Sequence, residues 1–122
     1  MSLAEQAGQA AVAALIDSEH RTRVLAWAIT ALRERRIDKA QSSELTRCTA
    51  EFTKLANVQL EYARAVGEKR PVYAGPLPTL AGLLALLEQN QLDRALEEGS
   101  RLRDELGPIL AEARSRLHEA RR

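Results

Sequence analysis

The sequence predicts an all-helical protein. The 122-residue chain is rich in leucine and alanine, which favour helices, and poor in β-branched residues. Aromatic residues make up only 3% of the chain, so we expect an aliphatic core. Apolar positions that alternate at steps of three and four indicate one face of a long helix: Leu45, Cys48, Phe52, Leu55, Gln59, Tyr62 and Val66. We expect a five-helix bundle of stacked αα-hairpins with this helix at its centre.

The first two helices are expected at Leu3–Ile16 and from the Asp17-Ser18 pair to Arg35. The first is rich in alanine, whose small side chain allows another helix to approach closely. Asp17 or Ser18 is expected to cap the second, since a short side-chain oxygen accepts a bond from a free backbone N–H there. The inner face of the second helix is expected to contain Leu25, Ala28, Ile29 and Leu32, flanked by Val24, Trp27 and Ala31.

The third helix carries the heptad pattern. Asp38 is its expected cap, Ile37 is placed for a hydrophobic staple, and Gly67 is a good residue to end it. Apolar residues surround the C-terminal part of this helix, which predicts coverage on several sides. Gln59 interrupts the apolar row and has three interpretations. It bonds to a neighbouring backbone group, bonds to its own copy across a two-fold axis, or lies at a partly exposed edge.

The remaining chain is expected to form an extended linker and two further helices. The linker of residues 68–78 contains Pro71, Gly75, Pro76 and Pro78. A fourth helix is expected at Thr79–Gln89 and a fifth from Leu92 towards the C-terminus. The Gly107-Pro108 pair interrupts the fifth, but its apolar stripe keeps phase, which favours a kinked helix over a sharp reversal. We expect one domain over residues 1–122, with a three-helix part at 1–67 and a hairpin at 79–122.

Composition and charge restrict the function classes. The formal net charge is +1, far from the excess expected of a dedicated nucleic-acid-binding protein. Cys48 is the one cysteine, so no intrachain disulfide can form, and a buried role in a reducing cytoplasm is expected. We recognise no secretory signal, and no apolar run approaches the roughly 18 residues of a membrane span.

The sequence contains no recognisable catalytic or metal-binding motif. His20 and His118 lack metal ligands at the usual spacings, and the glycines do not form a phosphate-binding loop. Many acidic residues have a basic residue one helical turn away, which predicts a solvated surface of weak ion pairs. We therefore expect a noncatalytic protein without a metal or cofactor.

Two surfaces are candidates for binding a partner. The first is apolar and would serve protein association, including a homo-oligomer: Ala4, Ala7, Ala11, Leu80, Leu83, Leu84 and Leu87. The second is a basic turn that would contact nucleic-acid phosphates: Arg33, Arg35, Arg36, Lys39 and Arg47. Basic residues at a helix C-terminus also complement the helix dipole without any ligand. The leading interpretation is a protein-interaction or assembly module, and the alternative is a small nucleic-acid-binding regulator.

Two segments resemble known families. Residues 80–106, with Asn90-Gln91-Leu92-Asp93-Arg94-Ala95 at the turn, resemble a single tetratricopeptide-type hairpin. Leu92 and Ala95 match that pattern, whereas Thr79 stands near its aromatic position and Leu83 near its glycine position. Residues 24–72, with the stretch Gln59–Pro71, are similar to short uncharacterised helical proteins of phages and other mobile elements. That similarity implies an accessory or regulatory role and supplies no functional residues.

Overall fold

The computed structural model describes residues 2–67 and 70–122, except the side chains of residues 4–7 and 9–16. Within these residues the chain is all-helical, with four helices: α1 (Leu3–Arg33), α2 (Lys39–Val66), α3 (Ala81–Glu88) and α4 (Leu92–Ala120). The all-α prediction is confirmed, and the count of five helices is corrected to four in the described part of the chain.

The correction concerns α1, which runs without a break through the predicted boundary at Ile16 and Asp17. No glycine or proline lies near that boundary, so the helical hydrogen bonds can continue across it. Asp17 therefore does not cap a second helix. Its Oδ1 instead accepts a hydrogen bond from the backbone N–H of Leu80 at 3.3 Å. Leu80 directly precedes α3, so Asp17 joins α1 to the start of a helix that is distant in sequence.

Both predicted ends of α2 are confirmed. The Asp38 side chain accepts a hydrogen bond from the Gln41 N–H at 2.8 Å, and the Asp38 N–H donates to Gln41 Oε1 at 3.0 Å. This reciprocal pair is a capping box. The expected staple residue Ile37 is buried. Gly67 ends the helix with a φ of 73°, a left-handed conformation that glycine adopts at little cost.

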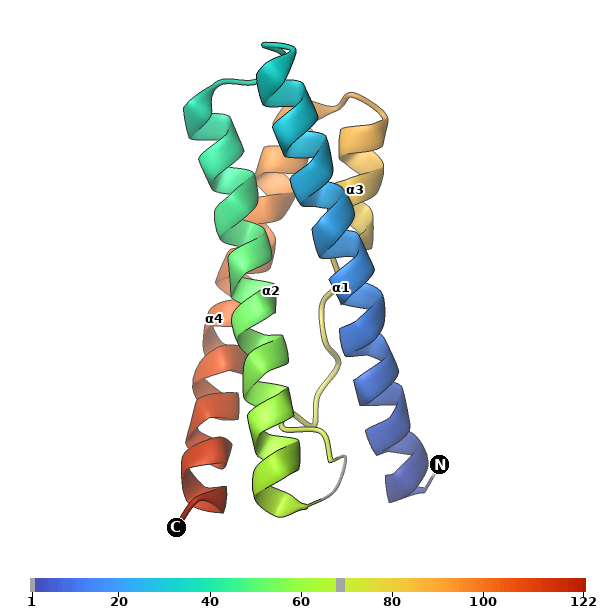
Figure 1. Ribbon diagram of the computed structural model, residues 1–122, viewed down its shortest axis with the longest axis vertical. Coiled ribbons are helices and arrows are strands. Elements are labelled where there is room, and N and C mark those ends of the chain that lie inside the picture. Colours follow the sequence, from blue (N-terminus) through green and yellow to red (C-terminus); the bar gives the residue numbers. More distant parts are fainter. Residues whose placement is uncertain (1, 68–69) are drawn as a thin grey trace.

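The helices form a bundle of three long helices, α1, α2 and α4, and the short helix α3. The α2 helix packs against α1 and α4, while α3 packs against α1 and α4. Figure 1 shows α1 running opposite to α2, and α2 and α4 running in the same direction. The linker climbs in an extended conformation below the short α3 helix (Figure 1). The prolines of the linker prevent it from forming a helix. The extended linker, called the strap below, and α3 together fill the fourth place in the bundle.

The core is mainly aliphatic and lies between the four helices, each of which contributes buried side chains. The first half of the heptad row is buried at Leu45, Cys48, Phe52 and Leu55. Beyond Val58 the row is only half-buried, and Leu60 is 57% exposed. The expectation that several sides of this end of α2 are covered is therefore wrong. The C-terminal end of α2 is contacted by the linker through Gln59. An extended linker is narrower than a helix, so it leaves part of this end exposed.

The inner face of α1 differs from the predicted one. Val24, Ala28 and Ala31 are buried, whereas Ile29 is 54% and Leu32 is 37% exposed. Residues 24–32 contain no charge at all, so the sequence pattern could not decide which side of this helix faces the core. Small residues occupy the contact side, and the larger side chains lie at its outer edge.

The α4 helix continues through the Gly107-Pro108 pair, so the alternative of a sharp reversal does not occur. Its expected apolar stripe is buried throughout: Leu102, Leu106, Ile109, Leu110, Ala113 and Leu117. Pro108 is exposed, as is Asp104, whose carbonyl lies one turn before it. Water can therefore bond to the backbone group that proline leaves without a partner.

Candidate functional site

The basic turn between α1 and α2 divides into paired and unpaired cations. Arg36 Nε donates to Glu34 Oε2 at 2.7 Å, and the Arg36 guanidinium lies 5.2 Å from the centroid of the Trp27 ring. Arg47 pairs with Glu44 at 3.2 Å. Two of the five predicted phosphate contacts are thus already engaged within the protein.

The unpaired cations of this turn are Arg33, Arg35 and Lys39, which are exposed. None of them forms an ion pair with the residues that the structure describes. Arg35 has a φ of 59°, an uncommon conformation for a residue with a side chain. The backbone of this tight turn presents three cations to solvent within residues 33–39, an arrangement suited to a polyanion.

The leucines predicted for an apolar interface are buried inside the bundle. Leu80, Leu83 and Leu87 are 0% exposed and Leu84 is 5% exposed, so these leucines belong to the core. The stripe faces inward because α3 packs against both α1 and α4. The other predicted interface residues, Ala4, Ala7 and Ala11, have side chains outside the described part of the structure.

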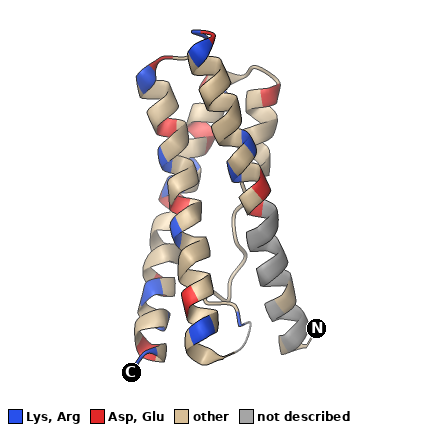
Figure 2. Cartoon of the chain, in the orientation of Figure 1, with Lys and Arg blue, Asp and Glu red and all other residues tan. Residues whose placement is uncertain are grey.

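A different apolar surface lies on α1. Arg21 Nη1 donates to Thr53 Oγ1 at 2.7 Å, which places this edge of α1 beside α2. Leu25, Ile29 and Leu32 follow Arg21 along the same edge at helical spacing, and Ala26 lies beside them. We name Leu25, Ala26, Ile29 and Leu32 the α1 apolar face. Figure 2 shows no charged residue on this part of α1, in contrast to the neighbouring α2 helix, which carries several.

The sequence held a signal for this surface. Residues 24–32 form an uncharged run between Arg23 and Arg33. The α1 helix packs against two neighbours, α2 and α3, and a helix covered on more than one side needs apolar residues on more than one face. The spread of apolar residues around the helix did not show which of them would stay exposed.

The linker is held against α2 by the Gln59 side chain. Gln59 Nε2 donates to the Arg70 carbonyl at 2.6 Å, and the Val72 N–H donates to Gln59 Oε1 at 2.8 Å. Of the three interpretations of Gln59, bonding to neighbouring backbone is confirmed. Val72 is only 1% exposed, so this contact closes one end of the strap over the bundle.

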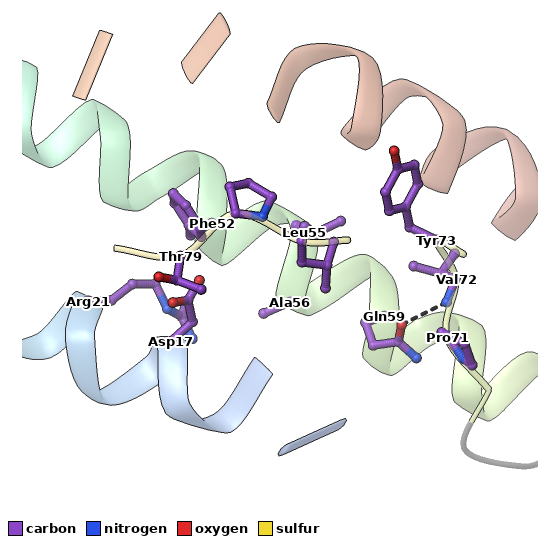
Figure 3. A pocket seen from close by; sticks show the side chains of 12 residues that line it. Asp17, Arg21, Phe52, Leu55, Ala56, Gln59, Pro71, Val72, Tyr73 and Thr79 are labelled. Atoms are coloured by element: carbon purple, nitrogen blue, oxygen red, sulfur yellow. Dashed lines mark hydrogen bonds between the residues drawn. The ribbon is translucent and has the colours of Figure 1, made fainter. Parts of the chain in front are cut away.

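A small cavity of about 50 Å³ lies between α1, α2 and the linker. Its walls are mainly apolar and include Phe52, Leu55, Ala56, Val72 and Leu77. Figure 3 shows Asp17 and Arg21 of α1 at one end of this space and Gln59 at the other. We name it the linker cavity. Burial raises the pKa of the Asp17 carboxyl group above its ordinary value, although its hydrogen bond from Leu80 opposes that shift.

The last residues considered for chemistry are Cys48, His20 and His118. Cys48 is buried, and burial raises the pKa of its thiol to about 11. The thiolate is the reactive form, so this side chain is inert at neutral pH. His20 is half-buried in α1 with Nδ1 3.5 Å from Asp17 Oδ1, whereas His118 is exposed.

The described residues contain no group of three or more histidine, cysteine, aspartate or glutamate side chains placed to hold a metal ion. No helix in the described part of the chain combines the length and apolar character that crossing a membrane requires. Comparison of the chain with family models, with curated proteins and with solved structures finds no match.

Proposed function

We propose that the chain is a noncatalytic assembly module that associates with a second copy of itself through the α1 apolar face. The observation that carries this proposal is the exposure of Ile29 and Leu32, at 54% and 37%, within the uncharged run of residues 24–32. Large apolar side chains grouped on one surface are typical of interaction sites.

The neighbouring surface of α2 favours the same role. Thr46, Ala50 and Thr53 are exposed, and they lack charge. Because a second helix would not have to remove charged groups from water, its approach to this surface carries little desolvation cost. Covering Ile29 and Leu32 buries only the part of each side chain that is still exposed, so it contributes about 1 kcal/mol for each. A contact of this size is consistent with a reversible, concentration-dependent association.

Two further expectations belong to this proposal. The resemblance of residues 24–72 to helical proteins of mobile elements suggests an accessory or regulatory setting. The buried free thiol of Cys48 fits a reducing compartment such as the cytoplasm.

The test is light scattering at several protein concentrations. We expect the apparent mass of the unaltered protein to rise with concentration. The variant carrying Ile29→Glu and Leu32→Glu should stay monomeric, because association would bury its added charges. Ala111→Glu is the control, since Ala111 is exposed on α4, a helix that does not contact α1 in the described part of the chain. A strictly monomeric unaltered protein at high concentration would contradict the proposal.

A second candidate function is nucleic-acid binding through the basic turn. It is favoured by one observation, the three exposed cations Arg33, Arg35 and Lys39 that have no ion-pair partner among the described residues. We expect binding to duplex or single-stranded nucleic acid to weaken steeply with added salt, because phosphate contacts release counterions.

Two triple variants test this second candidate function. Each removes three positive charges, and they differ in where those charges lie. Arg33→Gln, Arg35→Gln and Lys39→Gln together should abolish the binding. Arg114→Gln, Arg122→Gln and Arg64→Gln together remove the same charge from exposed positions elsewhere. If both triple variants bind equally, the attraction is nonspecific and the basic turn is not the site.

A further inference from the structure

An acidic residue and a basic residue stand at opposite ends of the α1 apolar face. Glu19 and Arg33 are exposed, and neither forms an ion pair with the residues that the structure describes. Arg23 follows Glu19 by one helical turn, but its guanidinium is already bonded to Glu88 of α3. The charges of Glu19 and Arg33 are therefore available to a partner outside the chain.

The spacing of these two residues places them on one side of α1. Glu19 precedes Ala26 by seven residues, and Arg33 follows Ala26 by seven. Seven residues make about two helical turns, so the three side chains lie nearly in line along the helix. Ala26 is the midpoint of this line, and its small side chain allows another helix to approach closely. The exposed residues on or beside the line between the two charges are all uncharged: Thr22, Ala26, Ile29 and Thr30.

The other charged residues of this part of α1 are directed towards its own bundle. Arg21 is half-buried and donates to Thr53 of α2 at 2.7 Å. Asp17 accepts from the Leu80 N–H at 3.3 Å, and the half-buried His20 lies beside it. These groups occupy the side of the helix that packs against neighbouring segments. They do not oppose a second helix on the outward side.

The two unpaired charges give the α1 apolar face a direction. If two copies paired their α1 helices in parallel, Glu19 would face Glu19 and Arg33 would face Arg33, and like charges facing each other are unfavourable. In an antiparallel pair, Glu19 of each copy lies opposite Arg33 of the other. A two-fold axis brings the same surface of both copies together, so both ends of the contact gain an attractive pair. Charge complementarity therefore favours the antiparallel arrangement.

We propose that two copies pair their α1 helices antiparallel about a two-fold axis at Ala26, with Glu19 of each copy bonded to Arg33 of the other. This inference rests on the assembly role proposed above and specifies the geometry of that contact. The apolar side chains between the two ion pairs supply the contact area, and the charges select the orientation. Because the ion pairs lie at the rim of the contact, added salt should weaken the association.

Reversal of single charges tests the orientation. Glu19→Arg and Arg33→Glu each turn both attractive pairs into repulsive ones, because the contact is symmetric. In light scattering at low salt, we expect each variant to raise the Kd of association about tenfold. Neither substitution removes an ion pair within the described chain, so the fold should be retained.

Two combinations should restore the association. The variant with both Glu19→Arg and Arg33→Glu has the same attractive pairs with their signs exchanged. An equal mixture of the two single variants also brings opposite charges together at both ends. We expect both samples to associate with the Kd of the unaltered protein.

The matched controls are Glu119→Arg and Arg114→Glu. Both residues are exposed on α4, which does not contact α1 among the described residues. These substitutions change the net charge by the same amounts as the variants on α1. We expect each control and their mixture to associate like the unaltered protein, which separates pairing at α1 from an effect of net charge.

A cysteine at Ala26 tests the position of the axis. A residue on a two-fold axis faces its own copy, so Ala26→Cys should form an intermolecular disulfide under mild oxidation. Ala111→Cys, at an exposed position of α4, should stay unlinked. Cys48 is buried and does not compete for this reaction.

The results separate this inference from the assembly role. A strictly monomeric unaltered protein would overturn both. If the unaltered protein associates but the single charge reversals leave its Kd unchanged, the antiparallel pairing alone is wrong. A mixture of the two single variants that binds more tightly than the unaltered protein would indicate parallel pairing, because the unaltered contact would then contain like charges. An Ala26→Cys variant that associates but stays unlinked would overturn the axis at Ala26.

Discussion

Gln59 on α2 and Val72 in the linker are joined by a hydrogen bond of 2.8 Å, in which the Val72 N–H donates to Gln59 Oε1. The same side chain donates from Nε2 to the Arg70 carbonyl. One amide therefore satisfies a donor and an acceptor of an extended segment that has no sheet partner. A polar residue in an apolar row is the means by which the strap is held on the bundle.

Replacing Gln59 should destabilise the protein. We expect Gln59→Ala to lower the free energy of unfolding by about 1–3 kcal/mol, because the Val72 N–H would be left without its acceptor at a buried position. Asn57→Ala on the exposed side of α2 is the matched control and should be neutral or slightly stabilising. Urea unfolding measures both. Equal effects of the two substitutions would show that the bonds to the linker contribute nothing.

Replacing Gly99 by alanine should stabilise the protein, whereas replacing Gly67 by alanine should destabilise it. A Cβ atom at Gly99 would lie 3.9 Å from the Cβ and Sγ atoms of Cys48, an ordinary contact. Gly99→Ala should therefore raise stability by about 0.5–1 kcal/mol through its higher helix propensity. Gly67 has a φ of 73°, so Gly67→Ala should cost about 1 kcal/mol. Thermal unfolding compares the two, and a lower melting temperature for Gly99→Ala would refute the packing described between α2 and α4.

The Cys48 thiol should make stability depend on pH in alkaline solution. Its pKa rises from 9.0 to about 11 on folding because burial disfavours the thiolate. The unfolded chain therefore loses this proton first as pH rises. The stabilising contribution is complete below pH 9.0 and is lost towards pH 11, by about 1.4 kcal/mol per pH unit within that window.

The measurement compares the unaltered protein with Cys48→Ala across this window. The two differ in the Cys48 titration while sharing their other ionisable groups, so the slope should be shallower in the variant. In the unaltered protein below pH 9.0, a thiol reagent should react only as fast as the protein opens. Rapid reaction under native conditions would mean that Cys48 is not buried as described.

The leucines of α3 should affect stability and not association. Leu83 is 0% exposed, so Leu83→Ala should cost about 2–5 kcal/mol of unfolding free energy. Ala85→Ser, at an exposed position of the same helix, is a mild control. Denaturant unfolding measures the effect on stability, and light scattering measures the effect on association. A Leu83→Ala variant with unaltered stability and weaker association would restore the predicted interface.

Local chemistry was readable in the sequence wherever it depended on neighbouring residues. The all-α class, the Asp38 cap and the Gly67 end of α2 follow from propensities and from bonds within a few residues. The buried stripe of α4 follows from apolar periodicity that Pro108 does not disturb, since its ring lies on the exposed side. The extended linker follows from prolines that cannot continue a helix.

The tertiary structure decided what depended on distant segments. Asp17 looked like a helix cap, but its oxygen accepts from the backbone at the start of α3, and α1 continues past it. The uncharged run at 24–32 presents several possible inner faces, and only packing against α2 and α3 selected the one with small residues. The α3 leucines belong to the core because α3 packs against both α1 and α4. Periodicity reports which residues share a face, whereas the direction of that face is set by the partners that the fold brings to it.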